Sequence, residues 1–242
     1  MELASRVALV TGAGRRVGRA IALALAAKRM RVAVHYNSSA NEADETVRLA
    51  LAAGAADAWT ISADLRDPAA ITKLVNDVVA HGGALDVLVN SAAEMKRTPF
   101  DTVTPEQWDD IMALNMKSPF FCSQEAARHM TKGGAIVNIA DLAALETWPE
   151  YIPHGISKAG VMQMTRALAR KLAPAIRVNA VVPGAVLLPE HWTKDDADKL
   201  IRTTPLARLG APEDVAHAVI YLLESDYVTG DAVVVDGGRH LR

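Results

Sequence analysis

The hydrophobic positions of this chain fall into short apolar runs that alternate with longer amphipathic segments. The short runs are rich in valine and isoleucine and apolar at consecutive positions, which is typical of strands covered on both faces. The longer segments repeat apolar residues three or four positions apart, the spacing of one side of an α-helix. The predicted strands are 7–11, 31–35, 58–61, 87–90, 135–139, 177–182 and 232–235. The predicted helices are 19–27, 40–53, 69–81, 105–129, 157–172 and 212–225.

This alternation predicts an α/β fold in which about seven strands form a doubly wound parallel sheet with helices on both faces. The chain has no Pro/Gly/Ser-rich linker, low-complexity tract or internal repeat that would divide it, so we expect a single domain over residues 1–242. One long stretch, about 184–205, shows neither periodicity and is predicted to be irregular.

Composition and charge exclude several classes of protein. The chain has 242 residues, of which 50% are hydrophobic and 22% charged, so it can build one aliphatic core. Its net charge of -2 provides no field that would gather nucleic acid or an anionic membrane. No apolar run reaches the roughly 18 residues of a membrane span, and the first residues lack the basic start of a signal peptide. We therefore expect a cytoplasmic protein that binds neither nucleic acid nor membrane.

Cysteine and histidine usage predicts no metal site. The single cysteine, Cys122, excludes an internal disulfide and a zinc site built from cysteines, and its apolar neighbours predict a buried, inert thiol. No two histidines share the spacing of metal ligands. We interpret His81, His129 and His217 as solvated or structural residues.

A glycine-bearing turn follows the first predicted strand. Thr11, Gly12, Gly14 and Gly18 stand between that strand and a predicted helix. Such a turn lets the backbone approach a pyrophosphate, and the start of the helix then offers N–H groups and a positive dipole. Because the turn opens the chain within a strand–helix–strand unit, it predicts a dinucleotide site and a Rossmann arrangement rather than a structural turn.

The end of the second predicted strand indicates which nicotinamide cofactor is bound. NAD sites place an acid there for the ribose 2′-hydroxyl, but this chain has no acid before Glu42. Arginines of the neighbouring turn suit a 2′-phosphate, and nearby hydroxyl and amide groups can complete its shell. The residues concerned are Arg15, Arg16, Asn37, Ser38 and Ser39. We expect NADP(H); the alternative is that these are only solvated loop residues.

The chain resembles the short-chain dehydrogenase/reductase family from end to end. The shared motifs are Thr11-Gly12 with Gly18, Asp64-Leu65, Asn90-Ser91-Ala92-Ala93, Asn115, Pro183-Gly184, 205–216 and 235–238. The resemblance implies a single-domain Rossmann oxidoreductase with a small-molecule substrate and a homotetrameric assembly. It also implies a set of cofactor-binding residues: Gly12, Arg15, Arg16, Val17, Asn37, Ser38, Ser39, Asp64, Leu65, Asn90, Ala92, Lys158, Pro183, Gly184 and Val186.

Three details are similar to the pteridine reductase branch of that family. Arg16 occupies the position of the family's middle glycine, and the second strand ends in a His-Tyr-X-X-Ser segment that begins at His35. Asp141 stands where most members have serine. By resemblance these details favour a pteridine-reductase-like enzyme.

The catalytic positions depart from the family pattern. The family uses a tyrosine as proton donor, a lysine four residues later and an asparagine that holds a water chain. Here Lys158 and Asn115 are present, but His154 occupies the tyrosine position. A neutral imidazole is too weak an acid, so His154 must be protonated to donate a proton, and Asp141, if it lies within reach, would stabilise that form. We predict a catalytic set of Asn115, Asp141, His154 and Lys158; the alternative is that His154 only fills the position and catalysis is crippled.

Other residues near these motifs are weaker candidates. The sequence argues against Tyr151 as a substitute donor, because Pro153 predicts a helix that begins only after it. Glu94, Lys96 and Arg97 follow the 90–93 motif, where the family's substrate mouth begins, and are candidates to contact a polar ligand.

The 184–205 stretch corresponds to the family's substrate flap. There Leu188 replaces a threonine that contacts the nicotinamide in many members, which puts that contact in doubt. Trp192 and Trp148 could form an aromatic wall or simply pack in the core.

Three functions are compatible with these features. The leading hypothesis is an NADPH-dependent reductase of a C=O or C=N bond, similar to pteridine reductases. The second is a reductase of 3-oxoacyl thioesters or other ketones. The third is a catalytically silent NADP(H)-binding protein in which His154 marks lost chemistry.

Overall fold

The seven-stranded sheet of the computed structural model is parallel throughout, and its strands follow the order β3-β2-β1-β4-β5-β6-β7. The structure describes residues 1–186 and 193–241. Every predicted strand is present, so the predicted doubly wound α/β fold is confirmed. The strands are β1 (Val7–Val10), β2 (Arg31–Tyr36), β3 (Asp57–Ser62), β4 (Val87–Asn90), β5 (Gly134–Ile139), β6 (Ile176–Pro183) and β7 (Ala232–Val235).

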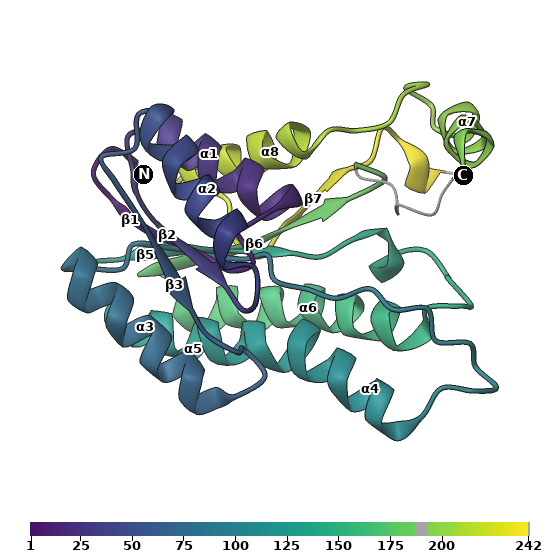
Figure 1. Cartoon of the computed structure of the whole chain (residues 1–242), viewed down its shortest axis with the longest axis horizontal. Coiled ribbons are helices and arrows are strands. Elements are labelled where there is room, and N and C mark those ends of the chain that lie inside the picture. Colours follow the sequence, from purple (N-terminus) through teal and green to yellow (C-terminus); the bar gives the residue numbers. More distant parts are fainter. Residues whose placement is uncertain (187–192, 242) are drawn as a thin grey trace.

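Helices cover both faces of the sheet, as Figure 1 shows. On one face lie α1 (Arg16–Ala27), α2 (Ala40–Ala52) and α8 (Pro212–Glu224). On the other lie α3 (Pro68–Gly82), α5 (Ser118–His129) and α6 (Ile152–Leu172). Shorter elements gather at the carboxyl ends of the strands: α4 (Pro105–Met112), α7 (Lys194–Thr203) and single turns at Ala113–Lys117, Leu142–Ala144 and Arg239–Leu241. These short elements surround the edge where the site is found.

Two large aliphatic cores, one on each face, and a smaller cluster between α6 and the end of β6 hold the described helices to the sheet. Alternate residues of one strand face opposite cores, so Ala8 and Val10 pack on the α1 and α8 side while Val7 and Leu9 pack on the α3 and α5 side. Cys122 lies in the second core, where burial raises the pKa of its thiol to about 12, and its predicted burial is confirmed.

The predicted helix at 105–129 is interrupted. Residues Ala113–Lys117 form a π-helical turn, and the N–H group of Ser118 donates to the carbonyl of Ala113, five residues back. Pro119 explains the widening, because it has no N–H group to donate to the carbonyl of Asn115 and its ring would clash with that group in a regular helix.

Two further predictions were wrong. Helix α6 begins at Ile152, with Pro153 inside its first turn, where a missing N–H group costs nothing. The stretch predicted to be irregular contains α7, which begins with a capping box between Thr193 and Asp196 and turns Leu200 inward. A ten-residue helix with one buried leucine is too short and too polar to show a clear period.

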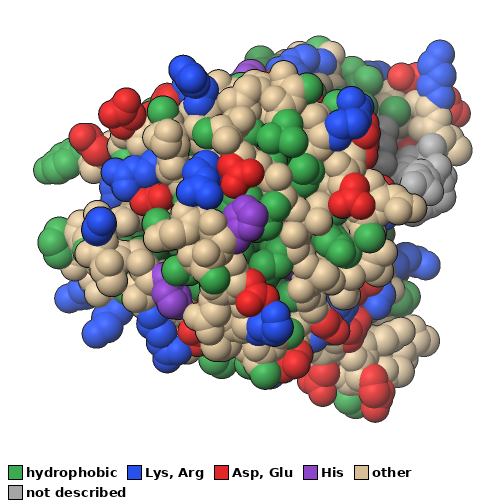
Figure 2. Space-filling view, turned by 60° about the vertical axis from the view of Figure 1, so that its left-hand side comes forward, with side chains coloured by type: hydrophobic (Ala, Val, Ile, Leu, Met, Phe, Trp, Pro, Cys, Tyr) green, Lys and Arg blue, Asp and Glu red, His purple; other side chains and the backbone are tan. Residues whose placement is uncertain are grey.

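Acidic and basic side chains are interspersed over the face shown in Figure 2, in keeping with the small net charge. Within residues 1–186 and 193–241, no helix is long and apolar enough to cross a membrane.

Candidate active site

The site lies at the carboxyl ends of β1 and β4, the neighbouring strands at which the strand order reverses. Ligands of open α/β sheets bind at this point. Thr11 Oγ1 accepts hydrogen bonds from the backbone N–H groups of Ser91 (2.9 Å) and Ala92 (3.0 Å), which ties the loop after β1 to the loop after β4. A Cβ atom on Gly12 would lie 2.9 Å from Cα of Ala92, so this close approach needs glycine.

The turn after β1 uses a left-handed backbone at Gly12 (φ +64°) and at Arg16 (φ +55°). A Cβ atom on Gly18 would lie 2.2 Å from the carbonyl oxygen of Gly12, so α1 packs directly on the turn. Arg15 is the N-cap residue of α1, and no side chain in the described part of the protein caps that helix start. Its first N–H groups are therefore available to a phosphate.

His35 links this turn to the next two strands. Its Nδ1 atom accepts the N–H group of Gly12 (3.0 Å), so the proton is on Nε2, which donates to the carbonyl of Ala63 (3.1 Å). Burial lowers the pKa of His35 to about 4, although the Ala63 carbonyl and Asp64 oppose that shift. The ring is therefore neutral near pH 7 and holds the turn in place.

The predicted phosphate-binding side chains lie around the start of α1 and the end of β2. Arg15 and Arg16 are exposed in the turn, and Asn37 and Ser38 are exposed after β2, with Ser39 half-buried. This set carries two cations and several donors. It could hold a dinucleotide that bears an additional phosphate on its ribose.

The side chains of several predicted cofactor residues point into the protein interior or pack against a core. The amide of Asn90 points into the interior, where Nδ2 donates to Asn138 Oδ1 (2.8 Å) and to Ser123 Oγ (3.1 Å), so Asn90 stays a predicted cofactor residue only through its backbone. Leu65 is buried in the α3-side core, and Val17 and Val186 pack against the α1-side core.

The remaining predicted cofactor residues stay at the edge of the site. Asp64 is half exposed next to Arg66, and Pro183 ends β6. Gly184 donates its N–H group to Val235, and a Cβ atom on it would lie 2.6 Å from Cβ of Asp236.

Both ring nitrogens of His154 contact protein groups. Nε2 lies 2.6 Å from Oδ2 of Asp141, while Nδ1 lies 3.1 Å from the carbonyl oxygen of Glu94 and 3.2 Å from Nδ2 of Asn115. The two Nδ1 partners suit different states: a bare Nδ1 accepts from Asn115, and a protonated Nδ1 donates to Glu94. The ring is thus provided with partners in its neutral form and in its protonated form.

Asp141 is the more open member of the pair. Its side chain is 22% exposed, whereas that of His154 is 2% exposed. Oδ1 of Asp141 accepts the N–H group of Ala143 (2.8 Å), which fixes the carboxylate at the start of a single helical turn. Burial alone raises the pKa of Asp141, but the hydrogen bond from His154 and the charge of Lys158 outweigh it and leave that pKa below its ordinary value.

Lys158 lies one helical turn after His154 and is buried. Its Nζ atom donates to the carbonyl of Ile139 (2.9 Å) at the end of β5. Burial lowers the pKa of Lys158, and the nearby Asp141 carboxylate partly offsets that effect. The structure therefore brings a buried amine, a carboxylate and an imidazole together.

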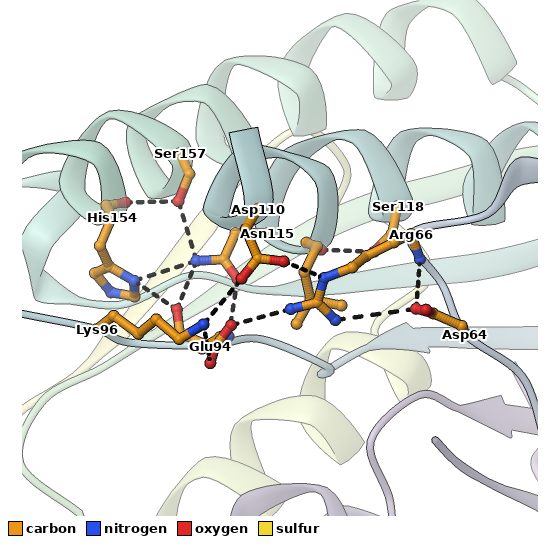
Figure 3. Close-up of polar contacts among 10 residues, drawn as sticks. Asp64, Arg66, Glu94, Lys96, Asp110, Asn115, Ser118, His154 and Ser157 are labelled. Atoms are coloured by element: carbon orange, nitrogen blue, oxygen red, sulfur yellow. Dashed lines mark hydrogen bonds and ion pairs between the residues drawn. The ribbon is translucent and has the colours of Figure 1, made fainter. Parts of the chain in front are cut away.

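Asn115 occupies the π-helical turn and is 1% exposed. Its Oδ1 atom accepts the N–H group of Glu94 (2.8 Å), and its Nδ2 atom donates to the carbonyl of Glu94 (2.8 Å). Direct contacts thus join Asn115, His154 and Asp141, and the charge of Lys158 acts on Asp141; Figure 3 shows the contact between Asn115 and His154.

The weaker candidates lie at the rim of this group. Tyr151 precedes α6 and packs edge-on against Trp148, with ring centroids 6.2 Å apart. Arg97 pairs with Glu150 (2.6 Å), and Lys96 enters an ion cluster. Leu188 and Trp192 lie outside the described residues.

No group of three His, Cys, Asp or Glu side chains in the described ranges could hold a metal ion. The sequence reading missed Arg66, Asp110 and the backbone of Glu94, all of which border the catalytic group. A backbone carbonyl leaves no signal in the residue type, so only the neighbouring charges could have pointed to it.

Residues 12–240 match a family described as enoyl-(acyl carrier protein) reductase. The chain is 38% identical over 246 residues to ketoacyl reductase 2 of the granaticin polyketide synthase of Streptomyces violaceoruber, covering 97% of this chain and 96% of that protein. It is 34% identical over 244 residues to the 3-oxoacyl-[acyl-carrier-protein] reductase FabG of Staphylococcus aureus, covering 98% and 99% of the two chains.

Solved structures agree with these sequence relatives. A short-chain dehydrogenase/reductase from Serratia marcescens is 34% identical and has a TM-score of 0.93, with 99% of this chain and 100% of that chain covered. The angucycline C-6 ketoreductase LanV, solved with bound NADP, is 32% identical and also has a TM-score of 0.93, covering 100% and 98%. The chain therefore belongs to the short-chain dehydrogenase/reductase family and is an oxidoreductase of that family.

Proposed function

We propose that this protein is an NADPH-dependent ketoreductase that acts on a 3-oxoacyl or polyketide-type ketone. Two observations support this: relatives named as ketoacyl reductases match almost the whole chain, and the site holds an imidazole and a carboxylate in direct contact. This is the second of the three functions considered from the sequence, and the comparisons favour it over the pteridine reductase that the sequence motifs suggested.

The residues around the phosphate turn fit NADP(H). Gly12 and Gly18 leave no room for a Cβ atom, the start of α1 is open to a phosphate, and Arg15 and Arg16 are exposed beside it. The bound NADPH would supply the hydride. Lys158 and the backbone at Ala92, Pro183 and Gly184 remain our candidates to hold its nicotinamide half, as the family resemblance implies.

The observation that carries the proposal is the 2.6 Å contact between His154 and Asp141. Reduction of a ketone requires a proton on the carbonyl oxygen as the C–H bond forms. We propose that the proton passes from Nε2 of protonated His154 to Oδ2 of Asp141, and that the more open carboxyl group delivers it to the substrate oxygen. His154 is left neutral with its remaining proton on Nδ1, facing the Glu94 carbonyl 3.1 Å away.

A substrate panel tests this proposal. The purified protein is incubated with NADPH or NADH and a 3-oxoacyl thioester, an aromatic polyketide ketone or a dihydropterin, and cofactor oxidation is recorded. We expect turnover of the ketones with NADPH, and little with NADH. Tight NADPH binding without turnover of any substrate would instead support a catalytically silent NADP(H)-binding protein.

Turnover of the dihydropterin alone would favour a pteridine-reductase-like enzyme. Two observations favour the pteridine-reductase-like alternative. Arg16 adopts a left-handed backbone at the family's middle-glycine position, and Asp141 lies within hydrogen-bond distance of His154 at the proton-donor position. We extend the proposal to a homotetramer, as the resemblance implies, and light scattering on the purified protein tests that part.

A further inference from the structure

Four charged side chains form a closed ring of ion pairs next to Asn115 and His154 (Figure 3). Arg66 contacts Asp110 through Nε (2.6 Å) and Glu94 through Nη2 (3.0 Å). Lys96 contacts the same two acids, Glu94 and Asp110, at 2.9 Å each. Each cation therefore bridges both acids. We call Arg66, Glu94, Lys96 and Asp110 the ion-pair ring.

The ion-pair ring joins three separate segments of the chain. Arg66 precedes α3, Glu94 and Lys96 follow β4, and Asp110 lies on α4. Hydrogen bonds from Arg66 and then from Lys96 lower the pKa of Asp110 to about 2, so Asp110 stays charged near neutral pH. Because each side chain is already ordered by two partners, a network of this kind holds its geometry better than an isolated surface pair.

The ring is attached to the catalytic group through one residue. Glu94 places its carboxylate in the ring, while its backbone N–H and carbonyl groups bond Asn115 and its carbonyl also contacts Nδ1 of His154. The opposite side of the ring, Asp110, lies on the helix that runs directly into the π-helical turn of Asn115. The ring therefore braces both sides of the contact between Glu94 and Asn115.

We propose that the ion-pair ring is a positioning device that holds the Glu94 carbonyl against Nδ1 of His154 and thereby stabilises the protonated imidazole. A carbonyl fixed 3.1 Å from Nδ1 accepts a hydrogen bond only when Nδ1 carries a proton. While Nε2–H donates to Asp141, a proton on Nδ1 is the additional proton that makes the imidazole cationic. The other charged groups near His154 are Asp141 at Nε2 and Lys158 on the same helix, and neither belongs to the ring. The catalytic consequence of this inference rests on the proposed function, but the contact itself does not.

Two substitutions of opposite charge separate positioning from simple electrostatics. Arg66→Gln removes a positive charge and Asp110→Asn removes a negative one, and each opens the ring. A purely Coulombic effect would move the titration of His154 in opposite directions in the two variants. If the ion-pair ring positions the Glu94 carbonyl, the titration of His154 moves to lower pH in both variants, because the protonated imidazole loses a hydrogen-bond acceptor in either case.

The experiment follows the His154 ring by NMR in cofactor-free protein with isotope-labelled histidine, its signal being identified by loss in His154→Phe. We expect the titration midpoint to fall by about one pH unit in both Arg66→Gln and Asp110→Asn, a tenfold change in proton affinity. Arg48→Gln, which breaks the exposed pair of Arg48 with Glu45 on α2, is the matched control and should leave the midpoint unchanged. Circular dichroism of each variant checks that it is folded.

Arg66→Lys provides a second test, since lysine keeps the charge but not the two-point contact, and its midpoint should lie between those of the wild type and Arg66→Gln. Midpoints that move in opposite directions, or that stay at the wild-type value in folded variants, overturn the inference. If the His154 midpoint falls in both variants but the protein reduces no substrate, the positioning role of the ion-pair ring is supported and the proposed function is contradicted. In an active enzyme, the fall of kcat with rising pH should begin at lower pH in both variants, with KM little changed.

Discussion

Asp141 and His154 are 2.6 Å apart, yet only Asp141 is open: its side chain is 22% exposed, against 2% for His154. The pair therefore separates two properties that a single tyrosine combines elsewhere in the family. In the proposed mechanism His154 holds the proton in a buried position, and the more exposed Asp141 delivers it to the substrate.

Replacement of Asp141 by asparagine should lower kcat by about 10²- to 10⁴-fold at pH 7, the usual contribution of a general acid. The amide can still accept the N–H group of Ala143, so the fold around it should be kept. Protonated His154 also loses its carboxylate, so the residual activity should decline with rising pH from a lower pH than in the wild type. Initial rates with saturating NADPH between pH 5 and 9 measure both effects, and an unchanged rate in Asp141→Asn would exclude the carboxyl group as the proton donor.

Two substitutions at His154 test whether the imidazole supplies the proton. His154→Phe should remove turnover but retain NADPH binding, because the phosphate turn lies on other elements. His154→Tyr places a phenol one helical turn before Lys158, the family arrangement, and should be active with a flat pH profile around neutrality. Full turnover in His154→Phe would transfer the proton-donor role to Tyr151, to water or to the substrate itself.

The positions of the seven strands could be predicted because strands buried on both faces have continuous runs of aliphatic residues. Val87, Leu88 and Val89, for example, are all fully buried in β4. The interruption at Ala113–Lys117 was missed, although Pro119 carries the signal for it: a proline inside a helix deprives the carbonyl four residues earlier of its partner. Short elements such as α7 were missed for a different reason, since one buried leucine gives no period.

The site was predicted only where side chains carry the chemistry. Asp141, His154 and Lys158 were identified through the family resemblance, which assigns roles to the side chains at those positions. The contact of Glu94 with His154 could not be predicted, because it is made by a backbone carbonyl group, which every residue has. Asn90 stays a predicted cofactor residue through its backbone, while its amide joins β4 to β5, because a motif does not specify where a side chain points.

Arg16→Gly should separate the charge of this arginine from its backbone conformation. Arg16 has a φ of +55°, so glycine relieves strain and should raise the free energy of unfolding by up to about 1 kcal/mol. Loss of a charge-assisted hydrogen bond to the 2′-phosphate should weaken NADPH binding roughly ten- to a hundredfold and leave NADH binding unchanged. Titration calorimetry with both cofactors measures the difference.

Arg29→Gly is the matched control for that substitution. Arg29 has a φ of +59° in the turn before β2, away from the phosphate turn, so the variant should gain the same stability without any change in cofactor affinity. If Arg16→Gly weakens the binding of NADPH and of NADH equally, Arg16 supports the conformation of the turn and does not bind the 2′-phosphate.

His35 should make the stability of the fold depend on pH in the acid range. Its pKa is about 4 in the folded protein and about 6.5 in an unfolded chain, so the unfolded chain binds the proton more tightly and stability falls as the pH drops from about 6.5 to 4. A shift of this size corresponds to about 3 kcal/mol in the free energy of unfolding. His35→Gln keeps an acceptor for the N–H group of Gly12 but cannot titrate, so the stability difference between wild type and variant in urea unfolding should shrink by about that amount between pH 7 and pH 4. His217→Gln, on the exposed side of α8, is the control and should follow the pH dependence of the wild type. A stability difference between wild type and His35→Gln that stays constant with pH would mean that His35 has the same pKa in the folded and the unfolded protein, and would contradict the prediction.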